Sequence, residues 1–141
     1  MIDDTYKQNQ TSWEAFRVTY DALQQYVVTF DETNPIYLDK QLAKKAGFQD
    51  IPLPATYPSL FWQGFYIPWL ENQPPFMLNA QTFTYHEPMV INHNYCGQIT
   101  LTKLRNHGNK QFAVHVLQLY DQIKVVATMT TTLVLTGEGV I

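Results

Sequence analysis

A carboxylate, an amide and a phenol lie close together around a single Asn-Pro step in the first third of the chain. Glu32, Asn34, Pro35 and Tyr37 fall within one short stretch. The carboxylate could handle a proton, but an unperturbed phenol titrates near pH ~10 and at neutral pH can only orient a water or donate a hydrogen bond. Each residue also has a structural interpretation: Glu32 as a solvated loop carboxylate, Tyr37 as a core aromatic, and Asn34-Pro35 as a turn between two helices.

Other residues that often carry chemistry are few and scattered. No two of the histidines, His86, His93, His107 and His115, have metal-ligand spacing on a helix, so we expect no metal site. Cys96 is the only cysteine, which excludes an internal disulfide and fits a reducing compartment. The sequence has no glycine-rich phosphate loop and no Gly-x-Ser-x-Gly motif, so a nucleotide enzyme or a serine hydrolase finds no support.

The composition predicts one globular domain, residues 1–141, that shares part of its surface with a partner. Charged residues make up 15%, below the usual ~25%, so we expect a partner subunit to cover part of the surface. Aromatic residues reach 14%, which favours an apolar binding tunnel or a subunit interface. A net charge of -3 without a basic stripe argues against nucleic acid. A polar N-terminus and the lack of a long apolar run predict no membrane span, and we expect a cytoplasmic location.

The chain before about residue 70 carries the helical signals. Thr19 can cap a helix over Tyr20–Phe30. A second, shorter helix over Asp39–Ala46 is expected to face inward with Leu42, Ala43 and Ala46, and to end at Gly47.

A third helix is predicted over Tyr57–Phe65, with Thr56 as its cap and Pro58 in its first turn. Apolar residues, including Leu60 and Tyr66, surround it almost completely. A helix without a polar face is normally buried on every side, so this segment is the candidate for a central helix covered by a sheet.

The remaining chain reads as strands. A short strand is expected within Trp13–Thr19, and long strands over Met77–Glu87, Tyr95–Arg105, Gln111–Tyr120 and Ile123–Leu135. The last one alternates most clearly, because every second residue from Ile123 to Leu135 is placed on one face and Thr128, Thr130 and Thr132 on the other. Long antiparallel strands around one apolar helix make an α+β domain.

Several motifs in this order resemble the MaoC-like hydratase/dehydratase family, especially its N-terminal-half members. They are Phe-Asp-Glu-Thr-Asn-Pro-Ile-Tyr-Leu-Asp over residues 30–39, Ala46-Gly47-Phe48, and Ile-Pro-Leu-Pro-Ala-Thr over residues 51–56. The segment Gln81–Pro88 also resembles the family's strand after the central helix. The resemblance implies a hot-dog fold, in which an antiparallel sheet wraps around a central buried helix.

The resemblance also implies chemistry on 3-hydroxyacyl thioesters of CoA or acyl carrier protein, with water removed or added and no further cofactor. In this family an Asp and a His at the two ends of the Asn-Pro segment hold the water, and backbone N–H groups near the start of the central helix polarise the thioester carbonyl. Glu32 stands at the Asp position and Tyr37 at the His position. The residues expected to bind substrate are Asn34, Pro35, Pro54, Thr56, Tyr57 and Ser59.

These departures from the family pattern leave several functions open. The chain is expected to be a dehydratase or hydratase subunit that binds the acyl chain and pairs with a second hot dog carrying the Asp and His. The alternatives are a self-sufficient homodimeric hydratase that uses Glu32, and an acyl-thioester or lipid-binding hot dog without chemistry. A thioesterase has the least support, since Tyr57–Leu70 contains no acid. In every case we expect a homodimer or heterodimer that pairs sheet edges.

Overall fold

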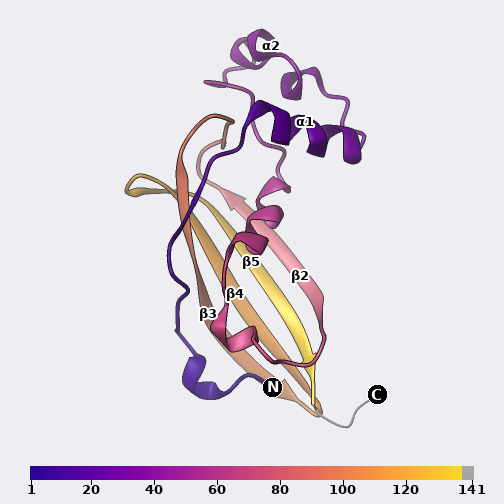
Figure 1. The fold of residues 1–141 in the computed structure, drawn as a ribbon, viewed down its shortest axis with the longest axis vertical. Coiled ribbons are helices and arrows are strands. Elements are labelled where there is room, and N and C mark those ends of the chain that lie inside the picture. Colours follow the sequence, from indigo (N-terminus) through magenta and orange to yellow (C-terminus); the bar gives the residue numbers. More distant parts are fainter. Residues whose placement is uncertain (138–141) are drawn as a thin grey trace.

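A five-stranded antiparallel sheet dominates the computed structural model, which describes residues 1–137. Its strands are β1 (Glu14–Phe16), β2 (Phe76–Tyr85), β3 (Tyr95–His107), β4 (Lys110–Asp121) and β5 (Lys124–Thr136), in the order β1-β3-β4-β5-β2. Figure 1 shows the four long strands side by side as one curved sheet. The four long strands expected from the alternation are thus confirmed, to within two residues at each end.

The alternation of β5 determines which face meets the core. Its inward residues are buried: Ala127, Met129, Thr131, Leu133 and Leu135. Ile123 and Val125 were expected on this face. The prediction is wrong for Ile123, whose side chain is 94% exposed. It is also wrong for Val125, which is half-buried while its neighbour Val126 is buried, because the pairing with β4 shifts register here. Asp121 pairs with Lys124 across a two-residue turn, with Gln122 at φ 58°, so Ile123 belongs to the turn and not to the strand.

Two α-helices lie beyond one end of the sheet (Figure 1). Helix α1 (Tyr20–Thr29) begins where the sequence predicts, since the Thr19 hydroxyl accepts from the Ala22 N–H at 3.1 Å. Its buried side chains are Leu23 and Val27.

Helix α2 (Lys40–Lys45) ends just before Gly47, which takes the positive φ of 100° that glycine tolerates. The prediction that Leu42, Ala43 and Ala46 all face inward is wrong, because only Ala43 is buried. The helix lies beyond the end of the sheet and not on its face, which fits its single buried residue (Figure 1).

The central segment differs from the expected α-helix. It forms a 3-10 helix, η3 (Tyr57–Gly64), followed by a second short one, η4 (Pro68–Leu70). Three residues per turn place Pro58 and Phe61 on one buried face and leave Leu60 exposed. Beyond η3 the chain alternates, so Phe65 is buried while Tyr66 is 61% exposed. The expectation of a segment buried on every side is therefore corrected to one buried face.

That buried face packs against the inner surface of the sheet. The Trp62 ring lies edge-on to His115 of β4 at 5.3 Å between centroids, and the Trp69 ring stacks on His115 at 5.9 Å. Phe16, the last residue of β1, stacks on Phe61 at 4.4 Å between ring centroids. The core therefore lies between η3, η4 and the concave face of the sheet, as the expected fold requires.

One edge of the sheet is covered by the N-terminal segment, and the other edge is not. The N-terminal segment covers β3 beyond the short β1, with Gln8 and Thr11 donating from their N–H groups to the carbonyls of Leu101 and Ile99. Strand β2 forms the other edge and, among the described residues, pairs with β5 alone. Within residues 1–137, no helix has both the length and the hydropathy to cross a membrane.

Candidate functional site

The Asn-Pro bend is held by its own side chains. The Asn34 carboxamide oxygen accepts from the Ile36 N–H at 3.2 Å and starts a 3-10 turn, η2 (Pro35–Tyr37). One oxygen of the Glu32 carboxylate accepts from the N–H groups of Thr33 and Asn34 at 3.1 and 3.2 Å. The bend is therefore built locally, and Glu32 helps to shape it.

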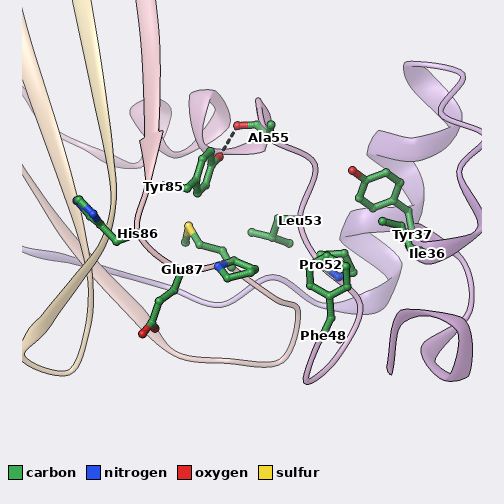
Figure 2. A pocket seen from close by; sticks show the side chains of 11 residues that line it. Ile36, Tyr37, Phe48, Pro52, Leu53, Ala55, Tyr85, His86 and Glu87 are labelled. Atoms are coloured by element: carbon green, nitrogen blue, oxygen red, sulfur yellow. Dashed lines mark hydrogen bonds between the residues drawn. The ribbon is translucent and has the colours of Figure 1, made fainter. Parts of the chain in front are cut away.

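A cavity of about 320 Å³ lies between this bend, the segment 48–55 and the end of β2. Apolar side chains dominate its walls: Ile36, Phe48, Pro52, Leu53 and Met89. Figure 2 shows Tyr37 on one side of Leu53 and Ala55, and Tyr85 on the other. An apolar space with phenol groups at its walls can receive a hydrocarbon chain that carries one hydrogen-bonding end.

The phenol groups around the cavity hold their protons more firmly than usual. Burial raises the pKa of Tyr37, and the nearby Glu32 and Tyr26 add to the effect. Burial, together with Tyr26 and Tyr37, raises the pKa of Tyr85 to about 12. Burial and Tyr26 also raise the pKa of Tyr57. At neutral pH these hydroxyls are hydrogen-bond donors and not bases.

Tyr85 and Tyr26 contact the segment that leads into η3. The Tyr85 hydroxyl donates to the Ala55 carbonyl, and the Tyr26 hydroxyl lies 2.7 Å from the Thr56 hydroxyl. Neither tyrosine is among the site residues predicted from the sequence. Tyr26 lies within the helix predicted over Tyr20–Phe30 and Tyr85 within the strand predicted over Met77–Glu87. Their role at the site depends on contacts between residues 30 positions apart.

Thr56 stands at the start of η3, but its hydroxyl does not cap the helix. The expected cap is therefore corrected: that hydroxyl bonds to Tyr26 instead. The N–H groups of Tyr57 and Ser59 donate to the carbonyls of Pro54 and Thr56 at 2.9 and 3.1 Å. Among residues 1–137, no protein acceptor lies within hydrogen-bonding geometry of the Thr56 N–H.

The remaining predicted site residues separate into two groups. Asn34 and Pro35 are exposed, whereas Pro54 and Tyr57 are buried. Of the whole predicted set, only Tyr37 lines the cavity. The cavity wall is completed by residues outside the predicted set, among them Tyr85 at the end of β2 and the segment 86–89 that follows it.

The histidines do not contribute an imidazole to this cavity. His86 borders it, but Figure 2 shows its ring turned away from Tyr85 and Leu53. His93 faces a second, more polar cavity of about 260 Å³, where its Nε2 lies 3.0 Å from an oxygen of Asp121. His115 is buried in the core. In the part of the chain that the structure describes, no three His, Cys, Asp or Glu side chains form a group able to hold a metal ion.

Comparison with known proteins identifies the family. Residues 8–129 match the family model described as FAS1-like, dehydratase domain region. The chain belongs to this FAS1-like dehydratase family. It is also 24% identical over 131 residues, 87% of each chain, to the UPF0336 protein of Clavibacter michiganensis subsp. michiganensis.

Solved structures confirm the hot-dog fold of this FAS1-like dehydratase family member. The C-terminally truncated HadBC (3R-hydroxyacyl-ACP dehydratase) complex from Mycobacterium tuberculosis matches with a TM-score of 0.85 and 13% identity, over 95% of this chain and 99% of that one. A MaoC-like dehydratase matches with a TM-score of 0.88 and 16% identity, over 96% of this chain and 43% of that one. The (R)-hydratase from A. caviae involved in PHA biosynthesis matches at 0.70 and 13%, over 93% and 98%. The resemblance to MaoC-like proteins seen in the sequence is thereby confirmed.

Proposed function

We propose that this chain is the substrate-binding subunit of a MaoC-like (R)-3-hydroxyacyl-thioester dehydratase, an enzyme that in reverse hydrates enoyl thioesters. The observation that carries the proposal is Tyr37, which stands at the family's histidine position and lines the apolar cavity. Burial and the neighbouring Glu32 raise the pKa of Tyr37 above its ordinary value of 10.0. A phenol of this kind donates a hydrogen bond but does not exchange protons at neutral pH.

The reaction explains why a second subunit is required. Removing water from a 3-hydroxyacyl thioester takes a proton from C2 and protonates the hydroxyl that leaves C3, so a base and an acid must both be present. Glu32 retains a carboxylate, but that group already accepts from two amides of its own loop. We infer that a partner hot dog with Asp-x-Asn-Pro-x-His moves the protons. No cofactor is needed, because the reaction breaks and forms C–H and C–O bonds without oxidation or reduction.

The cavity supports the binding half of this assignment. Its apolar wall would hold the acyl chain, and the Tyr37 hydroxyl would donate to the thioester oxygen. Among the described residues, no protein atom is hydrogen-bonded to that hydroxyl, so it is available to a ligand. The polar carrier, CoA or acyl carrier protein, would remain at the cavity mouth.

The uncovered edge of β2 supports pairing with a second hot dog. None of the ten residues of β2 is charged or a proline, and the edge residue Met77 is 72% exposed. Such an edge offers unpaired backbone groups to another strand.

The substitution Met77→Lys should convert a dimer into a monomer in size-exclusion chromatography at micromolar concentration, because it places a charge on this edge. Ile123→Lys, which changes an equally apolar side chain in a turn, is the matched control.

The decisive experiment assays hydration of short and long trans-2-enoyl thioesters. We expect little turnover from the chain alone and robust turnover when a hot-dog partner with Asp-x-Asn-Pro-x-His is added. Robust turnover by the chain alone that disappears in Glu32→Gln would replace the proposal with a self-sufficient homodimer. Tight thioester binding without turnover in any combination would leave an acyl-binding protein without chemistry.

A gain-of-function variant tests the same idea from the other direction. The double substitution Glu32→Asp and Tyr37→His restores the family's acid–base pair on this scaffold. We expect the double variant alone to hydrate enoyl thioesters at least ~100-fold faster than the unmodified chain, since general acid–base groups typically contribute ~10²–10⁴-fold. An unchanged rate in a folded, thioester-binding double variant would show that more than these two positions separates this subunit from an active one.

A further inference from the structure

Ala55 and Thr56, which share one peptide beside the cavity, are each hydrogen-bonded to a tyrosine of another element. Tyr85 reaches it from β2 and donates its hydroxyl proton to the Ala55 carbonyl. Tyr26 of α1 contacts the adjacent Thr56 side chain, with its hydroxyl 2.7 Å from the Thr56 hydroxyl. The Tyr26 ring is fixed in turn against Tyr57, at 4.9 Å between centroids. Ala55 and Thr56, which share this peptide, are thus each bonded to an element that lies far away in the sequence.

The geometry of the peptide bond turns this contact into an orientation. A trans peptide is planar, and its C=O and the following N–H point in opposite directions. The bond from Tyr85 to the Ala55 carbonyl therefore directs the Thr56 N–H to the side away from Tyr85. Figure 2 shows Tyr37 on that side of Ala55, within the same cavity wall. No protein acceptor among residues 1–137 occupies the Thr56 N–H.

We propose that Tyr85 and Tyr26 are positioning residues that aim the Thr56 N–H, so that it and the Tyr37 hydroxyl together bind the carbonyl oxygen of an acyl thioester. This inference rests on the proposed function. Two donors directed at one oxygen withdraw electron density from the thioester and stabilise the charge that develops on it when C2 loses its proton. Neither Tyr85 nor Tyr26 touches the reacting atoms in this arrangement.

The alternative is that Tyr85 only closes the cavity wall. Its ring packs in a half-buried position, and loss of its hydroxyl would then lower stability without changing how a bound carbonyl is polarised. A spectroscopic readout of the carbonyl separates the two roles, because it needs binding but no turnover. An enoyl thioester conjugated to an aromatic ring absorbs at longer wavelength when its carbonyl oxygen is hydrogen-bonded more strongly.

The experiment uses the full chain and trans-cinnamoyl-CoA. Binding to the unmodified chain should shift the absorption of the ligand to longer wavelength. Tyr85→Phe should bind within about 3-fold of the same affinity but lose at least about half of that shift. With an active hot-dog partner it should lower kcat by about 10-fold to 100-fold with little change in KM, as expected when a donor is misaligned. Tyr26→Phe should have a smaller effect in the same direction.

Tyr66→Phe is the matched control, since it removes a hydroxyl that bonds to the exposed Glu71. An undiminished shift in both Tyr85→Phe and Tyr26→Phe would overturn the inference. If Tyr85→Phe fails to fold, the shift in Tyr26→Phe and in Thr56→Val, which removes the same bond from the other side, decides in its place. Absence of any thioester binding by the unmodified chain would instead overturn the proposed function, which keeps the two failures distinct.

Discussion

Two places in this molecule surround polar aromatic groups with apolar side chains, and they do so in opposite ways. Under η4, His115 is fully buried, and burial lowers its pKa to about 4. Its Nε2 accepts from the Trp69 indole N–H at 2.8 Å, and its Nδ1 lies 3.1 Å from the Ala113 carbonyl. Beside the Asn-Pro bend, by contrast, the Tyr37 hydroxyl faces a cavity and has no partner among the described residues.

The difference shows that a strongly shifted pKa does not by itself mark a functional residue. An indole nitrogen only donates, so the Nε2 of His115 must be the acceptor and Nδ1 must carry the proton. Every polar atom of that imidazole is then satisfied, and it has no capacity left for a ligand. Tyr37, by contrast, has a hydroxyl without a protein partner among the described residues, and such a donor can bind a ligand.

The largest expected effect tests the buried site of His115, where every polar atom of the imidazole has a partner. His115→Leu leaves the Trp69 N–H buried without an acceptor, and an unsatisfied buried donor costs about 1–3 kcal/mol. We expect the free energy of unfolding to fall by about 3 kcal/mol, since packing is disturbed as well. Urea denaturation at pH 7 and fixed protein concentration measures it, with His115→Gln, which retains an acceptor, as the milder control. A loss below about 1 kcal/mol would show that the network is not structural.

The pH dependence of stability tests the same residue without changing its shape. The folded pKa of about 4 lies below the ordinary value of 6.5, so between these values the unfolded chain binds a proton that the folded chain does not. Stability is therefore complete above pH 6.5 and falls as the pH drops towards 4. From pH 7 to pH 5 this residue should remove about 2 kcal/mol from the free energy of unfolding. His115→Gln should lack that component, and equal pH dependence in both proteins would contradict the assignment.

The sheet was predictable from the sequence because its signal is local. Alternation along β5 predicts which side chains face the core, and this holds from Ala127 to Leu135. It fails at Ile123, where a turn residue continues the alternating pattern by composition alone. It also fails at Val125, where a shift in the pairing with β4 buries Val126 instead. The prediction for the central segment fails for a related reason. Apolar residues on all sides, Leu60 among them, indicate full burial but do not specify a 3-10 path.

The candidate site was predictable only in part. The Asn-Pro segment and Tyr37 could be located from motifs, since their spacing lies within one loop. The contacts of Tyr26 and Tyr85 with residues 55 and 56 could not, because they depend on how α1, β2 and the start of η3 meet in space. Residues that complete a cavity from a distant strand leave no spacing signal in one sequence.

The substitution Tyr37→Phe tests the other site, where the Tyr37 hydroxyl faces the cavity without a protein partner among the described residues. We expect the free energy of unfolding to change by less than about 0.5 kcal/mol, as for substitutions that remove no buried interaction. Thioester binding should weaken about 5-fold, corresponding to the ~1 kcal/mol of a typical net hydrogen bond. Isothermal titration with an enoyl-CoA measures the affinity. Unchanged affinity together with lost stability would make Tyr37 a core aromatic and remove the contrast with His115.

The smallest effect concerns the neighbouring polar cavity, where His93 and Asp121 pair at 3.0 Å. An imidazole beside a carboxylate is the pair that a dehydratase needs, and this cavity shares Phe48, Glu87 and Pro88 with the apolar one. Both side chains are about one-third exposed, however, and such pairs typically contribute ~0.2–1 kcal/mol. We expect Asp121→Asn to lower stability by about 0.5 kcal/mol and to leave thioester binding unchanged, with Asp4→Asn as a surface control. Loss of turnover in Asp121→Asn, in the assembled enzyme, would instead move the acid–base chemistry from the Asn-Pro bend to this second cavity.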